Sequence, residues 1–354
     1  MTARLRRFHG PWKLTDLATV PKNGLTAFSC FHCGGGSTMG YKLAGFNMLG
    51  GVEIDPEMMA IYRANHKPKH SYLMGVQQFN ELPLDDLPDE LKNLDLLDGS
   101  PPCSVFSMAG KREKKWGSEH HFREGQQKQR LDDLFMHFIE VGQRLQPKVI
   151  VAENVKGLIM GNAKGYVKEI FAAFREAGYD AQLFLFNAAR MGVPQARERT
   201  FFIARRRDLG WGKLEMRFDE STVTAGQALA GLTNQKGQPL SKAFLGAREW
   251  CVKNKKNRVE SWAIATFGKP KLWNHSLALP DQPTATLAST LRFIHWAEDR
   301  RLSDLECSRI QSFPDDYRWS GLDVGYICGM SVPPYMTQRV ALEISRQWFG
   351  KDYD

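Results

Sequence analysis

The sequence is poor in cysteine, with only six among 354 residues, and it lacks a long apolar run. Six cysteines in so long a chain are too few for the disulfide framework of a small secreted protein. No stretch reaches the ~18 apolar residues of a membrane helix, and the N-terminal MTARLRRFHGPWK has charge but no apolar segment of a secretory signal. We therefore expect a protein of the reducing cytoplasm, without a membrane partner.

The chain also lacks an acidic excess: 48 Lys and Arg stand against 39 Asp and Glu, a net charge of +9. Residues 111–130 hold seven basic and three acidic side chains, and residues 206–275 hold thirteen and six. A basic run alone is usually a solvated surface. Two such segments beside candidate catalytic strands favour a groove for nucleic acid.

Short apolar runs alternate with helical patterns in the first 207 residues. The pattern predicts strands at residues 24–31, 47–55, 94–100, 148–154, 180–188 and 199–206, and helices at 37–46, 56–66, 130–146 and 166–178. Continuous apolar strands joined by helices predict an α/β fold with a mostly parallel sheet covered on both faces. Ligands bind such sheets at the carboxyl ends of the strands. The rhythm is lost over residues 208–290, which predict a second, smaller domain.

Three consecutive glycines, Gly34 to Gly36, follow a predicted strand and precede a predicted helix. Such a turn lets backbone N–H groups approach a ligand, and Glu53, at the end of the next strand, suits ribose hydroxyls. Together they predict a nucleoside-containing cofactor, although the spaced-glycine dinucleotide pattern is missing. Cys30 and Cys33 could form a redox pair or half a zinc site, but no second close Cys/His pair follows, so we expect no metal.

Three further segments carry polar residues at predicted strand ends. In LLDGSPPCSVFS, two prolines fix the backbone before Cys103, which suits an aimed thiol better than a buried structural one. Glu153 ends a buried strand, where an acid is paired or functional, or caps a helix. Gln195, Arg197 and Arg199 alternate, which places them on one face of a strand. They fit phosphate or base recognition, with a polar strand edge as the alternative.

In this order the motifs resemble those of bacterial and phage DNA (cytosine-5)-methyltransferases. They are Phe31 with the glycine turn, Glu53, Pro102-Cys103 with Phe106-Ser107, Glu153-Asn154-Val155, Gln195-x-Arg197-x-Arg199, RRLSDLECSRIQSFPDDY and GMSVPP. The match covers residues 25–207 and 284–345. It implies a Rossmann-like sheet of an S-adenosylmethionine-dependent methyltransferase with a smaller target recognition domain. The expected divisions are a basic extension at 1–21, a catalytic and cofactor domain at 22–207 plus 322–354, and the target recognition domain with its hinge at 208–321.

The resemblance implies methyl transfer from S-adenosylmethionine, with S-adenosylhomocysteine as product, to carbon 5 of cytosine in a short double-stranded DNA sequence. Cys103 would add to carbon 6 of a flipped-out cytosine, which makes carbon 5 nucleophilic. Glu153 would protonate or hydrogen-bond ring N3 and the exocyclic amine. Arg197 and Arg199 would hold the cytosine carbonyl oxygen.

Cofactor and DNA contacts are also implied by the resemblance. The cofactor residues would be Phe31, Gly35, Gly36, Glu53, Ile54, Val76, Pro102, Leu134 and Ser331. The DNA residues would be Ser104, Ser107, Lys111, Arg112, Gln195 and Thr286, with a basic loop at about residues 104–128 closing over the flipped base. We expect a nucleoid-associated monomer whose partner is double-stranded DNA and which is either solitary or paired with a cognate restriction endonuclease that acts separately. We also expect the last helix, at 333–347, to pack onto the cofactor domain.

Several positions depart from the family pattern. Cys33 stands in place of a glycine of the turn, Ser104 in place of glutamine, Ile54 in place of a large aromatic residue, and Met330 in place of asparagine. The acid expected near the adenine amine is missing around Gly75. Most of these changes fall in the cofactor site, so we expect cofactor contacts that depend more on the backbone and a weaker affinity. The change at Ser104 should alter loop closure, not the chemistry.

Three alternatives remain at the level of the sequence. A tRNA methylase of the same fold would need a motif of its own in the variable region, and none is found. A catalytically inactive DNA-binding relative is disfavoured because Cys103, Glu153, Arg197 and Arg199 are all present. A nicotinamide oxidoreductase would use the glycine turn and Glu53 but leaves the Pro-Cys and Gln-Arg-Arg motifs unexplained.

Overall fold

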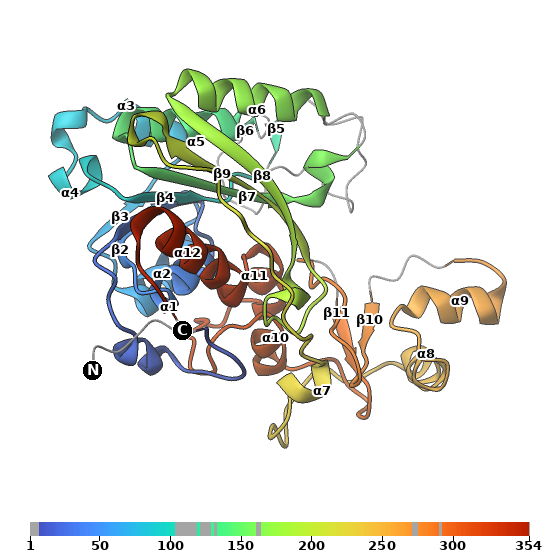
Figure 1. Ribbon diagram of the computed structural model, residues 1–354. Coiled ribbons are helices and arrows are strands. Elements are labelled where there is room, and N and C mark those ends of the chain that lie inside the picture. The colour runs from blue at the N-terminus through green and yellow to red at the C-terminus, as the bar shows by residue number, and fades with distance from the viewer. Residues whose placement is uncertain are drawn as a thin grey trace.

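The computed structural model describes residues 7–102, 119–120, 129–130, 133–160, 164–270, 275–289 and 292–353. Its centre is a seven-stranded sheet of order β3-β2-β1-β4-β7-β9-β8 (Figure 1). The strands are β1 (Thr26–Cys30), β2 (Asn47–Glu53), β3 (His70–Leu73), β4 (Leu96–Gly99), β7 (Val149–Val155), β8 (Tyr179–Asn187) and β9 (Glu198–Arg206). All neighbours pair in parallel except β9, which is antiparallel to β7 and β8. The predicted mostly parallel sheet is confirmed, with β3 as an additional short strand.

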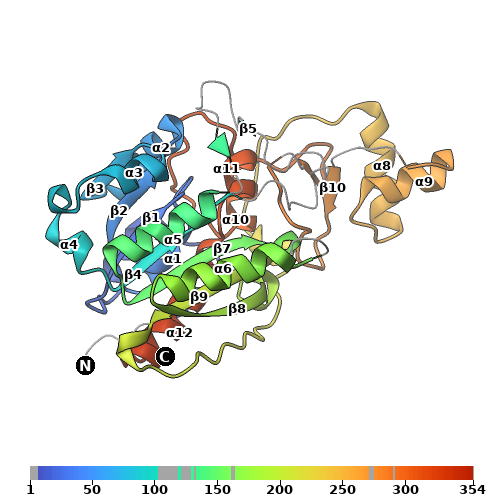
Figure 2. The same cartoon turned by 90° about the horizontal axis from the view of Figure 1, so that it is seen from above.

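Helices cover both faces of this sheet (Figures 1 and 2). One face carries α1 (Gly36–Leu43), α2 (Pro56–His66) and α12 (Pro334–Phe349), and the other carries α3 (Val76–Glu81), α5 (Leu134–Leu145) and α6 (Lys164–Glu176). Each face has its own buried core, with Met39 and Val340 in one and Phe79 and Phe138 in the other. The short α4 (Asp89–Lys92), α10 (Asp304–Ile310) and α11 (Val324–Met330) complete the main body.

The helix boundaries follow local sequence signals. α2 begins at Pro56, and the Asp55 carboxylate before it accepts hydrogen bonds from the N–H groups of Glu57 and Met58, an N-cap followed by a proline at the first helical position. The predicted start of a helix at residue 130 was wrong. α5 begins at Leu134, because β6 (Gln129–Arg130) pairs instead with β5 (Glu119–His120).

The predicted packing of the last helix onto the cofactor domain is confirmed by the contact between α12 and α1. A Cβ atom on Gly40 of α1 would lie 2.5 Å from Cβ of Thr337 and 2.5 Å from the carbonyl oxygen of Pro334. Nε2 of Gln338 also donates to the carbonyl oxygen of Leu43, 3.0 Å away. The two helices therefore meet where only glycine fits.

The N-terminal segment packs against the main body. Trp12 is 4% exposed, and its Nε1 donates to the carbonyl oxygen of Ser312 at 2.9 Å. The 3-10 helix η1 (Leu14–Thr19) follows, and the N–H of Leu14 donates to Asp316 at 2.7 Å. The described residues 7–21, which the sequence suggested as part of a basic extension, thus lie across the C-terminal part of the fold.

A smaller lobe projects from one side of the main body (Figures 1 and 2). It contains α8 (Lys242–Lys253), α9 (Val259–Phe267) and the parallel strands β10 (His275–Ala278) and β11 (Arg292–His295). Its own core includes Ala247, Cys251, Val259, Leu277 and Ile294. The segment around α7 (Ala225–Ala228) contributes instead to the main core. Within residues 208–321, where the target recognition domain was expected, only the middle part thus has a hydrophobic core of its own.

Among the described residues, no helix combines the length and the apolar character that crossing a lipid bilayer requires.

Candidate active site

The segment that leads to Cys103 is fixed at the carboxyl end of β4. Asn154, which is 3% exposed, donates from Nδ2 to the carbonyl oxygen of Pro101, 3.1 Å away. β7 therefore holds the backbone two residues before the expected nucleophile. Cys103 lies outside the described residues, as do the predicted DNA contacts Ser104, Ser107, Lys111 and Arg112.

Glu153 and Arg199 form a largely buried ion pair at the same edge of the sheet. Nε of Arg199 lies 2.9 Å from Oε1 of Glu153, and their side chains are 13% and 10% exposed. The antiparallel pairing of β7 with β9 brings the two residues together. Burial raises the pKa of Glu153, opposed mainly by the positive charge of Arg199. A carboxyl group with a raised pKa holds its proton longer and can donate a hydrogen bond.

Arg197 has a different set of partners. It is 2% exposed, and its Nη1 donates to the carbonyl oxygen of Leu287 at 2.8 Å. Nη2 donates to the carbonyl oxygens of Gly329 and Ser331, at 2.9 and 3.1 Å. Its two terminal nitrogens therefore bind two backbone segments: the one around Leu287, next to the smaller lobe, and the one from Gly329 to Ser331, at the end of α11 and before α12.

Gln195, predicted to contact DNA, is buried in this structure and has no exposed surface. Its Nε2 donates to Oε1 of Gln311 at 2.7 Å, and its Oε1 accepts from the N–H of Leu287 at 2.9 Å. The expected strand alternation fails here, because β9 begins only at Glu198 and Gln195 pairs in parallel with Thr284. In this arrangement its amide holds protein groups and is not accessible to DNA.

Thr286 lies next to this pairing and is half-buried. Its hydroxyl donates to the carbonyl oxygen of Ala196, 3.0 Å away. The segment at 284–287 therefore follows the segment at 194–197 like a short added strand. DNA contact by Thr286 stays a prediction.

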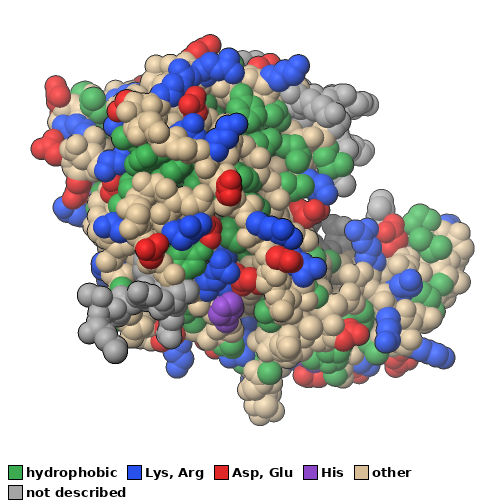
Figure 3. Space-filling view, viewed as in Figure 1, with side chains coloured by type: hydrophobic (Ala, Val, Ile, Leu, Met, Phe, Trp, Pro, Cys, Tyr) green, Lys and Arg blue, Asp and Glu red, His purple; other side chains and the backbone are tan. Residues whose placement is uncertain are grey.

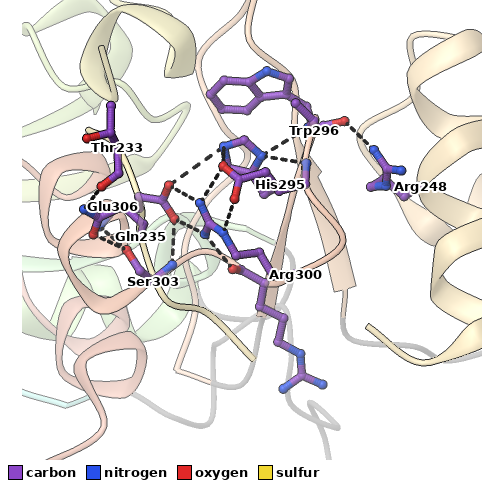
Figure 4. A network of polar contacts seen from close by, with 11 residues as sticks. Thr233, Gln235, Arg248, His295, Trp296, Arg300, Ser303 and Glu306 are labelled. Carbon is purple, nitrogen blue, oxygen red and sulfur yellow. Dashed lines mark hydrogen bonds and ion pairs between the residues drawn. The ribbon is translucent and has the colours of Figure 1, made fainter. Parts of the chain in front are cut away.

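A buried polar network holds the connection between β11 and α10 (Figure 4). The Arg300 guanidinium donates to both oxygens of Glu306, at 2.6 and 2.9 Å, and the N–H of Ser303 donates to the same carboxylate at 2.7 Å. Nδ1 of His295 accepts two backbone hydrogen bonds at 3.1 Å, and Trp296 stacks on its ring. Because bidentate Arg–carboxylate pairs are strongly directional, this network fixes how the smaller lobe joins the main body.

Glu53 lies at the end of β2, where the cofactor site is expected. Its carboxylate accepts hydrogen bonds from the N–H groups of Cys33, Ile54 and Asp55, at 2.9, 2.9 and 3.1 Å. An ionised carboxylate offers about four acceptor positions, so one remains for a ligand hydroxyl. The glycine turn is thereby tied to β2 through Glu53.

The structure brings four of the predicted cofactor residues around one depression. Phe31, Glu53, Ile54 and Val76 line it, together with Val52, Met74 and Gly75. One carboxylate among apolar side chains matches the chemistry of an adenosine, which has a flat ring and a hydroxylated sugar. The lining of this depression therefore fits the adenosine part of S-adenosylmethionine.

Gly35 and Gly36 are required by close packing around the turn. Gly35 has a φ of +75°, and a Cβ atom there would lie 2.3 Å from Nε2 of His66. A Cβ atom on Gly36 would lie 2.1 Å from the carbonyl oxygen of Val332. The turn is thus pressed between α2 and the start of α12.

The remaining cofactor predictions fare differently. Pro102 follows β4 and is half-buried. Leu134 has no exposed surface and belongs to the core beneath α5, so its predicted cofactor contact is not supported. Ser331 is 3% exposed and its carbonyl oxygen accepts from Gln311 at 2.7 Å. Its cofactor contact stays a prediction.

Cys33 adopts a backbone conformation that favours glycine. Its φ is +47°, in the left-handed region that costs a residue with a side chain roughly 1 kcal/mol. This explains why the family pattern has glycine at the position. Burial raises the pKa of its thiol to about 12, so it is a poor redox nucleophile. Within the described ranges, no three His, Cys, Asp or Glu side chains are grouped to hold a metal ion.

Sequence reasoning missed the role of Asp98. Its carboxylate, 3% exposed, accepts hydrogen bonds from the hydroxyls of Ser29, Ser37 and Tyr41. The available signal was an acid inside the apolar run LLDG, since a buried carboxylate needs partners.

The seven-stranded sheet, with Glu53 and the Glu153–Arg199 pair at its strand ends, has the architecture of a methyltransferase. Residues 25–346 match the model of the C-5 cytosine-specific DNA methylase family, and the chain belongs to that family. It is a DNA cytosine-5 methyltransferase.

Two curated relatives illustrate the match. The chain is 29% identical over 347 residues to the Type II methyltransferase M.FnuDI of Fusobacterium nucleatum, which covers 92% of this chain and 95% of that protein. It is 31% identical over 341 residues to the Type II methyltransferase M1.HphI of Haemophilus parahaemolyticus, with 90% and 86% covered.

Solved structures share the fold. One is a prophage-encoded E. coli protein described as a DNA modification methyltransferase, with a TM-score of 0.67 at 21% identity, covering 92% of this chain and 99% of that one. Another is DNMT2 of Spodoptera frugiperda, with a TM-score of 0.63 at 15% identity, covering 91% and 99%.

Proposed function

We propose that the chain methylates carbon 5 of cytosine within a short, specific sequence of double-stranded DNA, by base flipping and a transient Cys103 adduct at carbon 6. One observation carries the proposal: the buried Glu153–Arg199 pair lies at the end of β7, and the next residue, Asn154, holds Pro101. Cys103 comes two residues later in the sequence. An acid and a cation at the end of a strand, next to the segment that leads in sequence to a thiol, match the needs of cytosine activation.

Each side chain has a distinct task in this chemistry. The Cys103 thiolate adds to carbon 6, which turns the ring into an enamine whose carbon 5 can attack a methyl group. Removal of the proton from carbon 5 then breaks the bond between carbon 6 and sulfur and frees the Cys103 thiolate. Glu153 donates to ring N3, so that negative charge does not accumulate there. Arg199 holds the cytosine carbonyl oxygen and keeps Glu153 in place. Arg197 positions the backbone around the site and does not contact the cytosine, because its described contacts are backbone carbonyl oxygens.

The proposed methyl donor is S-adenosylmethionine, which supplies an electrophilic methyl group when bound. Glu53 would accept from a ribose hydroxyl with its remaining acceptor position, and Phe31, Ile54 and Val76 would enclose the adenine. Gly35 and Gly36 keep the backbone close to the ligand. The expected weaker affinity, caused by the departures at Cys33 and Ile54, remains part of the proposal.

The smaller lobe supplies a surface for DNA phosphates. Its exposed basic side chains are Lys242, Lys253, Lys255, Lys256, Arg258 and Lys269. Figure 3 shows Lys and Arg side chains on this lobe and a hollow between it and the main body. Neutralising several phosphates makes affinity strongly dependent on salt. Since the relatives are named Type II methyltransferases, we assign the chain to restriction–modification, as a monomer beside a separate endonuclease.

A trapping experiment tests the mechanism. DNA with 5-fluorocytosine cannot lose the group at carbon 5, so the enzyme should stay covalently attached when S-adenosylmethionine is present. Cys103→Ala should abolish the adduct, whereas Cys307→Ala, which removes a thiol elsewhere, should retain it. An absence of adduct with wild type on a mixed genomic substrate would refute the proposal. Adducts on tRNA in place of DNA would favour the RNA alternative, and bisulfite mapping of methylated DNA identifies the target sequence.

A further inference from the structure

Asp98 carries a buried negative charge in the middle of the sheet. It lies on β4, opposite Ser29 of β1 and Val151 of β7, and is 3% exposed. The Ser29 and Ser37 hydroxyls each donate to Oδ2 at 2.7 Å, and the Tyr41 hydroxyl donates to Oδ1 at 3.1 Å. Three O–H donors stabilise an ionised carboxylate, because they give it hydrogen bonds without adding a charge.

No cation in the described part of the chain pairs with this carboxylate. The charged group that acts on it most strongly is another carboxylate, that of Glu153 on β7. Cys30 of β1 and the phenols of Tyr41 and Tyr62 also lie near it and are neutral at ordinary pH. Burial raises the pKa of Asp98 to about 6. A buried, uncompensated charge is costly, so its presence calls for a positive partner.

The network of Asp98 lies directly beneath the glycine turn. Ser37 is the second residue of α1, which begins at Gly36, and Ser29 precedes Phe31 by two residues. The turn is also bound by Glu53, whose carboxylate accepts from the N–H of Cys33. Two buried carboxylates thus attach to one turn, Asp98 from β4 and Glu53 from β2. Their charge makes this region attractive to a cation.

The two forms of the proposed cofactor differ in charge. S-adenosylmethionine carries a sulfonium, and methyl transfer to carbon 5 leaves the sulfur electron pair behind as the neutral thioether of S-adenosylhomocysteine. We propose, on the basis of the proposed function, that Asp98 is a specificity-determining residue that favours the cationic donor over its neutral product. The same charge that attracts the donor gives no comparable attraction to the product, which promotes its release.

Binding measurements on the full-length protein test this without turnover. Titration calorimetry would compare S-adenosylmethionine, S-adenosylhomocysteine and sinefungin, which carries an amine in place of the methylated sulfonium. In Asp98→Asn, the two cationic ligands should bind about tenfold more weakly, while the affinity for S-adenosylhomocysteine stays within about twofold. Ser37→Ala and Tyr41→Phe each remove a hydrogen bond that lowers the pKa of Asp98, so in both variants the preference for the cationic ligands should be lost at a higher pH than in wild type.

Two results would overturn the inference: an equal loss for all three ligands in Asp98→Asn, or no loss for any. If wild type bound none of them, the proposed function itself would fail. If Asp98→Asn did not fold, the pH dependence of ligand binding by wild type would test the inference instead. The preference for S-adenosylmethionine over S-adenosylhomocysteine should shrink between about pH 8 and about pH 5, because Asp98 takes up a proton near pH 6. A constant preference would contradict it.

Discussion

The guanidinium of Arg197 donates to the carbonyl oxygen of Leu287, 2.8 Å away, although 90 residues separate them in the chain. On the other side, the N–H of Leu287 donates to Oε1 of Gln195 at 2.9 Å. Leu287 is therefore held at both its N–H and its C=O by the segment that leads into β9. The same strand carries Arg199, so the position of the Glu153–Arg199 pair depends on how the smaller lobe docks.

Arg197 and Arg199 should differ in what their removal costs. Arg197→Ala leaves the buried carbonyl oxygens of Leu287 and Gly329 without this donor, while that of Ser331 keeps Gln311, and we expect the free energy of unfolding to fall by about 3 kcal/mol. Arg199→Ala leaves Glu153, which can take up a proton, so the loss should be nearer to about 1 kcal/mol while methyl transfer fails. Urea denaturation gives the first quantity and transfer of labelled methyl groups the second. Equal destabilisation by both changes would contradict this division of roles.

The rate of methyl transfer should depend on the protonation of Glu153. Burial raises the pKa of this carboxyl group, and the protonated form donates to the base, so the rate should fall as pH rises through that pKa. Arg199 lowers the pKa, so Arg199→Met should move the falling limb to higher pH, at a reduced rate. Single-turnover rates across about pH 5–9 would show it. Arg217→Met, far from Glu153 in the sequence and exposed, should leave the limb unmoved, and an unmoved limb in Arg199→Met would refute the assignment.

Cys33 offers a reversal of the usual order of alanine and glycine. Because its φ is +47°, glycine tolerates the backbone and alanine does not. Cys33→Gly should therefore be more stable than Cys33→Ala by about 1 kcal/mol, measured from thermal or urea unfolding. Ala60, an exposed residue inside α2, serves as a control. There alanine should be more stable than glycine, so Ala60→Gly should lower the free energy of unfolding. A Cys33→Ala variant at least as stable as Cys33→Gly would show that the backbone there is not strained.

The N-terminal segment should be coupled to α12 through Glu220. Arg339 of α12 has no exposed surface and pairs with Glu220 through Nε and Nη2, at 3.1 and 3.0 Å, while Arg7 lies 3.3 Å from the same carboxylate. Glu220→Gln should lower the free energy of unfolding by about 3 kcal/mol, since it leaves a buried cation uncompensated. Glu215→Gln, at an exposed position, should change it by under about 0.5 kcal/mol. Similar effects of both changes would show that the Arg339 pair contributes little.

The sheet could be predicted because its central strands are buried on both faces. Runs such as KVIVAEN and RTFFIARR are dominated by apolar residues, and β7 and β9 were recognised. β3 was missed because its four residues are half-buried or exposed. In the smaller lobe, α9 is a nine-residue helix without a clear polar face, so periodicity could not reveal it.

A site residue could be predicted from the sequence where its chemical type alone indicates its role. It could not be predicted where its accessibility depends on contacts with residues distant in the sequence. Glu153 and Arg199 form an ion pair, as expected of an acidic and a basic side chain at the ends of adjacent strands. Gln195 was predicted to bind DNA because its alternation with Arg197 and Arg199 indicated one polar face of a strand. Its burial depends on Leu287 and Gln311, distant in sequence and close only in the fold. The same holds for Trp12, whose partner Ser312 is 300 residues away.

The contact between α1 and α12 has a consequence for how the protein is made. Leu43 and its partner Gln338 are 295 residues apart, so at ordinary synthesis rates a ribosome needs roughly 15–60 s to travel from one to the other. During that interval the face of α1 that packs on α12 has no such partner in the nascent chain. The packing of α1 against α12 can form only when α12 has emerged from the ribosome, so we expect no methylation from a nascent chain that ends before Phe349.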